Sequence, residues 1–167
     1  MAYYPDLIQV LKTVPLFLDL KEFQLAKLAE TASIVEFEPG GIVISEGGKL
    51  DCLYIILEGE IKVEVFVPAY GNIETSHLGP LDILGWSALT PVVRQRTGTA
   101  TCISNCFLLR FDTKKLIPLC ELDHDLGMII YKRVANVAAR SFLTTRLQLM
   151  NLIMNSAQSH KVSPDLE

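Results

Sequence analysis

The chain has 167 residues, half of them hydrophobic, and a formal net charge of −4 at pH 7. This length fits one domain with an appended element, and the hydrophobic fraction suffices for a sizeable core and excludes general disorder. The acidic balance excludes the basic surface that general nucleic-acid binding proteins carry.

The N-terminus and the cysteines indicate the compartment. No apolar run approaches the ~20 residues that a membrane helix needs. The first six residues lack the basic and apolar regions of a signal peptide. The cysteines form no CxxC pair, which is typical of buried thiols rather than of a disulfide framework. We therefore expect a cytoplasmic protein without a membrane segment, whose reduced cysteines are Cys52, Cys102, Cys106 and Cys120.

Two helices are predicted near the N-terminus. Apolar residues recur at helical spacing until Pro15 stops them, which predicts a short helix over about residues 5–13. A second amphipathic helix is predicted over residues 19–32, with Asp19 as a possible N-cap. We assign residues 1–33 to these N-terminal helices.

From residue 34 the pattern changes to a period of two, which is typical of strands. Residues 52–57 form a strongly β-prone run, and residues 61–67 alternate most regularly. About eight short strands separated by glycine turns point to a β-barrel or jelly roll. The predicted fold class is mainly β with flanking helices, with a double-stranded β-helix (jelly roll) over residues 34–112.

The last third of the chain is predicted to be helical. Asp112 or Thr113 would cap a first helix, and no proline interrupts residues 123–155. Such a long helix exceeds what one small barrel can cover, so we expect it to pair with the same helix of a second copy. Residues 113–155 are assigned to C-terminal helices that include this dimerisation helix, and residues 156–167 to a flexible tail. The apolar spacing of three and four continues through Leu143, Leu147, Met150 and Met154.

Residues 78–103 call for a functional explanation. Their first half turns tightly and then begins a single helical turn, whose first amide groups have no partner inside the turn and can hold an anion. Their second half contains Arg94 and Arg96, and a guanidinium fits a phosphate or a carboxylate. Together the two halves predict an anion-binding cassette. Arg96 is the expected anion ligand, whereas Arg94 is better explained as a solvated neighbour.

Several short motifs follow one another over residues 15–97. They are PLF at 15–17, FEPG at 37–40, EG at 46–47, LYIILEG at 53–59, GPLDILG at 79–85, AL at 88–89 and RT at 96–97. In this order and spacing the chain, from about residue 14 to 147, resembles the cyclic-nucleotide-binding domain of the catabolite activator protein type. The resemblance implies a jelly-roll sensor that dimerises along its long C-terminal helix.

The resemblance also implies a ligand site. The family's phosphate cassette is a Gly-Glu-x-Ala-Leu turn followed by Arg-Ser/Thr-Ala. Here the turn would supply amides near a cyclic phosphate, Arg96 would pair with the charged oxygen, and Thr97 would add a hydroxyl. An ungapped reading from Arg96 places Ser141 and Phe142 against the purine, where they would hydrogen-bond and stack. The expected ligand-binding residues are Leu84, Gly85, Trp86, Ser87, Ala88, Arg96, Thr97, Ser141 and Phe142.

The chain departs from the family pattern at two positions. Trp86 replaces the glutamate that accepts the ribose 2'-hydroxyl, and a buried hydroxyl left unpaired costs about 1–3 kcal/mol. Leu81 replaces the usual second glycine of the turn. Two readings of Trp86 stay open: it plugs a degenerate pocket, or it stacks on a different ligand.

These observations predict a regulatory module rather than an enzyme. It would sense a cyclic nucleotide (cyclic AMP or GMP) or a related phosphate-bearing small molecule and signal through its C-terminal helix. The alternative is a non-sensing dimeric adaptor whose pocket is closed by Trp86. No nucleophile–base pair is apparent, and the histidines are isolated, so we expect no catalytic group, metal or cofactor. The chain ends too early for the helix-turn-helix of related transcription factors, so we expect no direct DNA binding.

Overall fold

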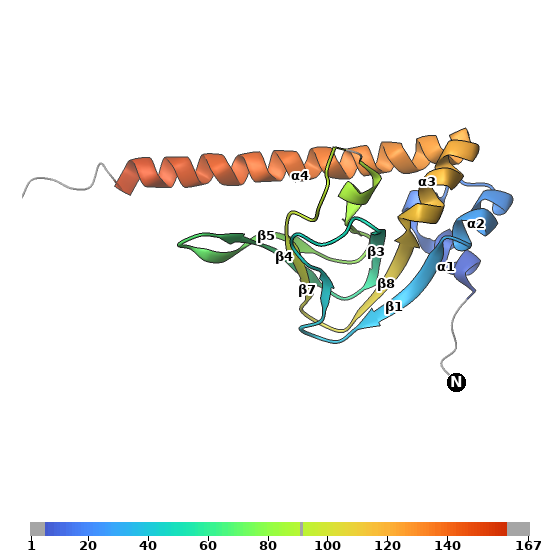
Figure 1. Cartoon of the computed structure of the whole chain (residues 1–167), viewed down its shortest axis with the longest axis horizontal. Coiled ribbons are helices and arrows are strands. Elements are labelled where there is room, and N and C mark those ends of the chain that lie inside the picture. Colours follow the sequence, from blue (N-terminus) through green and yellow to red (C-terminus); the bar gives the residue numbers. More distant parts are fainter. Residues whose placement is uncertain (1–5, 91, 160–167) are drawn as a thin grey trace, which may run out of the picture.

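The structure is a computed structural model that describes residues 6–90 and 92–159 (Figure 1). Two four-stranded antiparallel sheets make up its centre, in the orders β1-β8-β3-β6 and β2-β7-β4-β5. This arrangement confirms the predicted jelly roll. The strands are β1 (Ala32–Phe37), β2 (Ile42–Ile44), β3 (Cys52–Glu58), β4 (Ile61–Val67), β5 (Gly71–Leu78), β6 (Ile83–Leu84), β7 (Thr99–Cys102) and β8 (Cys106–Asp112).

Short helical elements precede the strands and one lies between them. They are α1 (Leu7–Thr13), η1 (Pro15–Phe17), α2 (Glu22–Ala29) and η2 (Trp86–Leu89). The predicted second helix was too long, because residues 18–20 form a turn and a bend before α2, and β1 already begins at Ala32. Asp19 is not its cap, since α2 starts after Lys21, whose amide donates to the Gln24 side chain at 3.0 Å. Asp19 instead pairs with Arg133 at 3.3 Å.

Strand β3 is buried on both faces, which explains its continuous apolar run. Leu53 and Ile55 belong to a core cluster beneath the helices, where Phe17 also packs edge-on against Phe111 with ring centroids 5.8 Å apart. Tyr54 and Ile56 belong to a second cluster, which is shared with β4, β7 and β8. The helices and both sheets are therefore held together through this strand.

The C-terminal helices are α3 (Thr113–Leu122) and α4 (His124–Ser159). Asp112 caps α3 by accepting a hydrogen bond from the Lys114 amide at 2.9 Å. It was one of the two caps predicted for this helix. The first turns of α4 pack on the core through Leu126, Ile130 and Val134. The helix then crosses the molecule and continues past the tip of the β4–β5 hairpin (Figure 1). It runs beyond the predicted end at residue 155, and residues 160–167 of the predicted tail lie outside the described residues.

All four cysteines are buried and free, as predicted. Burial raises the pKa of Cys120 to about 11 and that of Cys102 to about 12, so both thiols are protonated at neutral pH. Among the helices of the described residues, none combines the length and the apolar character that crossing a bilayer would require.

Candidate ligand cavity

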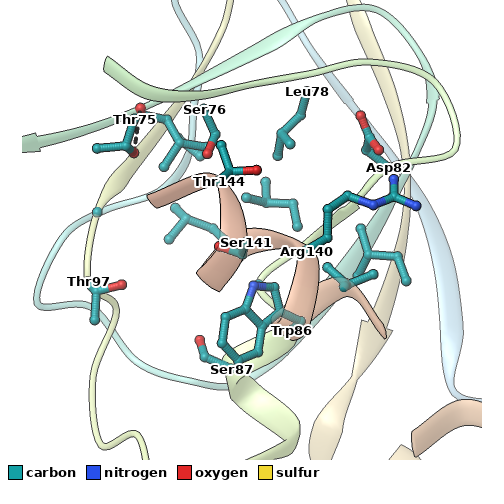
Figure 2. A pocket seen from close by; sticks show the side chains of 18 of the residues that line it. Thr75, Ser76, Leu78, Asp82, Trp86, Ser87, Thr97, Arg140, Ser141 and Thr144 are labelled. Atoms are coloured by element: carbon teal, nitrogen blue, oxygen red, sulfur yellow. Dashed lines mark hydrogen bonds between the residues drawn. The ribbon is translucent and has the colours of Figure 1, made fainter. Parts of the chain in front are cut away.

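A cavity of about 940 Å³ lies between the second sheet, the segment around η2, and α4. Figure 2 shows side chains of these elements around it: Trp86 and Ser87 from η2, Thr75 and Ser76 from β5, and residues of α4. Its volume lies within the range of about 300–1,000 Å³ that is typical of small-molecule sites. The cavity therefore has room for a ligand.

Arg96 lies at the edge of this cavity and is only 4% exposed. Its Nε donates to the Lys49 carbonyl at 3.0 Å, its Nη1 donates to the Gly85 carbonyl at 3.0 Å, and its Nη2 donates to the Cys52 carbonyl. The guanidinium thus joins the β2–β3 loop, β3 and the start of η2. Three of its five N–H groups are used in this way, and the described residues accept no hydrogen bond from the other two.

The electrostatic setting of Arg96 favours the arrival of an anion. Burial lowers the pKa of its guanidinium, and the nearby charge of Asp51 acts in the opposite direction. No carboxylate of the described residues forms an ion pair with it. A buried cation that hydrogen-bonds only to carbonyl oxygens, with a carboxylate nearby but not paired to it, is only partly neutralised, so a phosphate or carboxylate would interact strongly with it.

Gly85 is required by this arrangement. Its φ is 77°, in the left-handed region, and a Cβ at this position would lie 2.7 Å from Nη1 of Arg96 and 3.0 Å from the Cys52 carbonyl oxygen. Only glycine allows the backbone to approach the guanidinium this closely. The sequence predicted that the Gly85 turn and Arg96 would hold one anion between them, whereas here the guanidinium bonds directly to the Gly85 carbonyl.

The turn after Gly85 supplies part of the predicted cassette. Trp86 and Ser87 begin η2, and both line the cavity. Their amides are the first of the turn and have no acceptor inside it. The Ala88 amide differs, because it donates to the Gly85 carbonyl at 3.0 Å, and Ala88 is buried away from the cavity lining. The predicted role of the Ala88 amide in ligand binding therefore has no support in this geometry.

Residues 34–123 match the protein-family model described as the cyclic nucleotide-binding domain. The chain belongs to the cyclic nucleotide-binding domain family. Domains of this family are regulatory modules rather than catalytic ones. A relative, the cAMP-dependent protein kinase regulatory subunit of Dictyostelium discoideum, is 30% identical over 117 residues, which cover 67% of this chain. The match spans about a third of that relative, 35% of its length.

Solved structures of similar proteins share the fold. The N-terminal domain of a transcriptional regulator from Streptomyces coelicolor A3(2) is 26% identical and superposes with a TM-score of 0.64, covering 79% of this chain and 94% of that one. The catabolite activator protein of Thermus thermophilus is 18% identical and superposes with a TM-score of 0.67, covering 83% of this chain and 62% of that one. The second likeness concerns the fold alone.

Within this cyclic nucleotide-binding domain, most of the predicted site residues lie together. Leu84, Thr97 and Ser141 line the same cavity as Gly85, Trp86, Ser87 and Arg96. Phe142 does not, because it is 66% exposed and lies outside the cavity lining. The predicted stacking of Phe142 on a ligand is therefore wrong for this arrangement of one chain.

Helix α4 contributes more of the cavity wall than the sequence reading assigned to it. Its polar side chains there recur at helical spacing, which is a signal that the sequence carried. Gln148 also donates from Nε2 to the Thr75 carbonyl at 3.1 Å, which links α4 to β5. The residues missed by sequence reasoning on this helix are Arg133, Asn136, Val137, Arg140, Thr144, Thr145 and Gln148.

Leu81 marks a strained point of the cyclic nucleotide-binding domain. Its φ is 71°, a left-handed conformation that costs a residue with a side chain about 1–2 kcal/mol. Its amide donates to the Ile56 carbonyl at 2.7 Å, which holds the turn against β3. The backbone at Leu81 thus keeps the left-handed conformation that a glycine would adopt more easily.

Proposed function

We propose that this chain is a regulatory module that binds a cyclic nucleotide, or a related phosphate-bearing small molecule, in the cavity beside Arg96. The observation that carries the proposal is the buried guanidinium of Arg96 against Gly85, with no carboxylate partner among the described residues. The kinase regulatory subunit named above supports cyclic AMP as the first ligand to test.

Helix α4 is the proposed output of the module. It lines one wall of the cavity, while the Arg96 segment and η2 line another. A ligand that contacts both walls binds one position of α4 better than another, and only such differential affinity can shift the equilibrium between positions. Occupancy would then change how α4 meets its partner, which we infer to be the same helix of a second copy.

The alternative of a closed, non-sensing adaptor receives less support. In that reading the indole of Trp86 fills the pocket. Trp86 instead forms part of the wall of a cavity of about 940 Å³ and packs partly against the core cluster beneath the helices. An open cavity favours the ligand-binding reading.

The direct test is calorimetric titration of the wild-type chain with cyclic AMP and cyclic GMP, repeated with Arg96→Lys. Lysine keeps the charge but loses the planar fork, so we expect binding at least about tenfold weaker. Arg94→Lys is the matched control, because Arg94 is exposed and lies outside the cavity lining.

Circular dichroism of both variants checks that each is folded. If neither nucleotide gives a heat of binding with the wild-type chain, the proposal is refuted for these two ligands. Equal affinity of wild type and folded Arg96→Lys would refute the assigned role of Arg96. In either case the adaptor reading would gain support.

A further inference from the structure

The cavity carries more positive charge than one phosphate needs. Among the described residues its lining contains Arg96, Arg133 and Arg140 but only one carboxylate, that of Asp82. This excess stands out in a chain whose formal net charge is −4. Concentrated cationic side chains in a hollow attract anionic ligands.

The three arginines differ in how their charge is used. Arg96 is buried on backbone carbonyls, and Arg133 pairs with Asp19 at 3.3 Å. Arg140 is exposed, and no described residue forms a hydrogen bond or ion pair with its side chain. Within residues 6–90 and 92–159, its guanidinium is therefore the one of the three without a partner.

Arg140 is placed to meet a ligand inside the cavity. Figure 2 shows its side chain extending from α4 on the side of Asp82, away from Trp86 and Ser87. Asp82 does not neutralise it, because no ion pair joins the two, and Oδ2 of Asp82 accepts the Gly79 amide at 3.0 Å. Arg140 and Arg96 thus belong to different walls of one cavity, one on α4 and one on the loop before β7.

The size of the cavity also suits a large ligand. About 940 Å³ lies near the upper end of the range for small-molecule sites, which reaches about 1,000 Å³. Hydroxyl groups of Ser76, Ser141 and Thr144 line it besides the arginines, so neutral polar groups of a ligand can also be bound.

We propose that the cavity binds a ligand with two separate phosphate groups, of which one pairs with Arg96 and the second pairs with Arg140. The inference rests on the proposed function and names the class of ligand for the same site. A second phosphate on Arg140 would tie the ligand directly to α4, because the guanidinium binds phosphate through charge-assisted hydrogen bonds.

The test compares two probes with the same base by calorimetry: cyclic AMP, with one phosphate, and the cyclic dinucleotide of two adenylates, with two. We expect the wild-type chain to bind the dinucleotide at least about tenfold more tightly, as a charged hydrogen-bonded contact provides. Arg140→Gln should remove most of this preference and reduce the dependence of dinucleotide affinity on salt. Arg146→Gln is the matched control, since Arg146 lies on the same helix outside the cavity lining.

The cyclic AMP titration tests the proposed function, and the comparison with the dinucleotide tests this inference. If cyclic AMP binds and the dinucleotide binds no more tightly, the inference is wrong and the proposed function stands. A preference that survives in Arg140→Gln, or is lost equally in Arg146→Gln, also overturns the role of Arg140. If neither probe binds the wild-type chain, both proposals fail for adenylate ligands. Thermal melts of both variants confirm folding, which we expect because both arginines are exposed.

Discussion

Arg96 joins three chain segments before any ligand arrives. Each of its three carbonyl acceptors comes from a different segment, and its own amide donates to the Gly48 carbonyl at 3.1 Å. A buried arginine held in this way loses little further side-chain freedom when an anion binds. The same contacts make Arg96 a structural residue, which is why a charge-preserving substitution is the informative one.

Trp86 stands where the resemblance expects the group that accepts the ribose 2'-hydroxyl. Trp86→Glu places a carboxylate at the cavity wall, where the resemblance expects an acceptor for the ribose 2'-hydroxyl. Because an unpaired hydroxyl costs about 1–3 kcal/mol, we expect cyclic AMP affinity to rise by about tenfold or more, as measured by calorimetry.

Trp86→Gln is the control for the loss of the indole without a new charge. Its affinity should stay below that of Trp86→Glu. Equal affinities for the two variants, or no gain in either, would mean that the cavity has diverged from ribose recognition at more than this position.

The Asp123 carboxylate stabilises the connection between α3 and α4. Asp123 ends α3, and its Oδ1 accepts the Leu126 amide in the first turn of α4 at 3.0 Å. The Gln24 side chain donates to the same carboxylate at 3.1 Å, which ties α2 to the joint. The hydrogen bond from Leu126 is the main cause that lowers the pKa of Asp123 from its ordinary value of 3.8.

This lowered pKa predicts a pH dependence of stability. Because the folded-state pKa lies below the unfolded value, the carboxylate stabilises the fold above about pH 4 and loses this effect as the pH falls through the folded-state pKa. Asp123→Asn should therefore lower the melting temperature at pH 7, and its difference from wild type should shrink near pH 3. Asp125→Asn removes the same charge in the first turn of α4 and should cost less at pH 7. A deficit of Asp123→Asn that is constant from pH 7 to pH 3 would contradict this role.

The strands were predictable because their signals are local. Alternation in β4 and the continuous apolar run of β3 each follow from burial on one or two faces. The second helix was placed too early because Asp19 looks like a cap, whereas its carboxylate is used by Arg133, 114 residues away. Such a partner is set by tertiary packing and has no signature near Asp19.

The site was predictable in part for the same reason. The segment from Gly85 to Thr97 carries its own motif, and all of the ligand-binding residues predicted in it line the cavity except Ala88. The residues of α4 were assigned by an ungapped reading of the family pattern from Arg96. Such a reading finds the right turn of the helix, but it does not tell which side chains of that turn face the cavity. Ser141 lines the cavity, Phe142 lies outside its lining, and Arg140 was missed.

At the scale of the whole molecule, the outer half of α4 leaves an apolar surface uncovered. A long helix with such a surface is stabilised when it pairs with another. Leu143, Leu147, Met150 and Met154 follow the spacing of a coiled-coil seam. The exposed large apolar residues on this half, among those described, are Phe142, Leu143, Leu147, Leu149, Met150, Leu152, Ile153 and Met154.

We therefore expect the wild-type chain to be a dimer in solution. The double variant Leu147→Glu/Met150→Glu should be a monomer at the same micromolar concentration, because four like charges would meet in the seam. Sedimentation equilibrium gives the mass directly. Ala135→Glu is the control on an exposed position of the inner half of α4 and should stay dimeric. A wild-type chain that sediments as a monomer would contradict the expected pairing.

The hydrogen bond from Gln148 to Thr75 has a mechanical consequence. It holds α4 to β5 next to the cavity, and the helix extends about 16 Å further, at about 1.5 Å per residue, to its end at Ser159. A tilt about this attachment moves the far end most and the attachment least. We therefore expect a ligand that tilts α4 to displace most the residues beyond Gln148, where the exposed apolar surface of the helix lies.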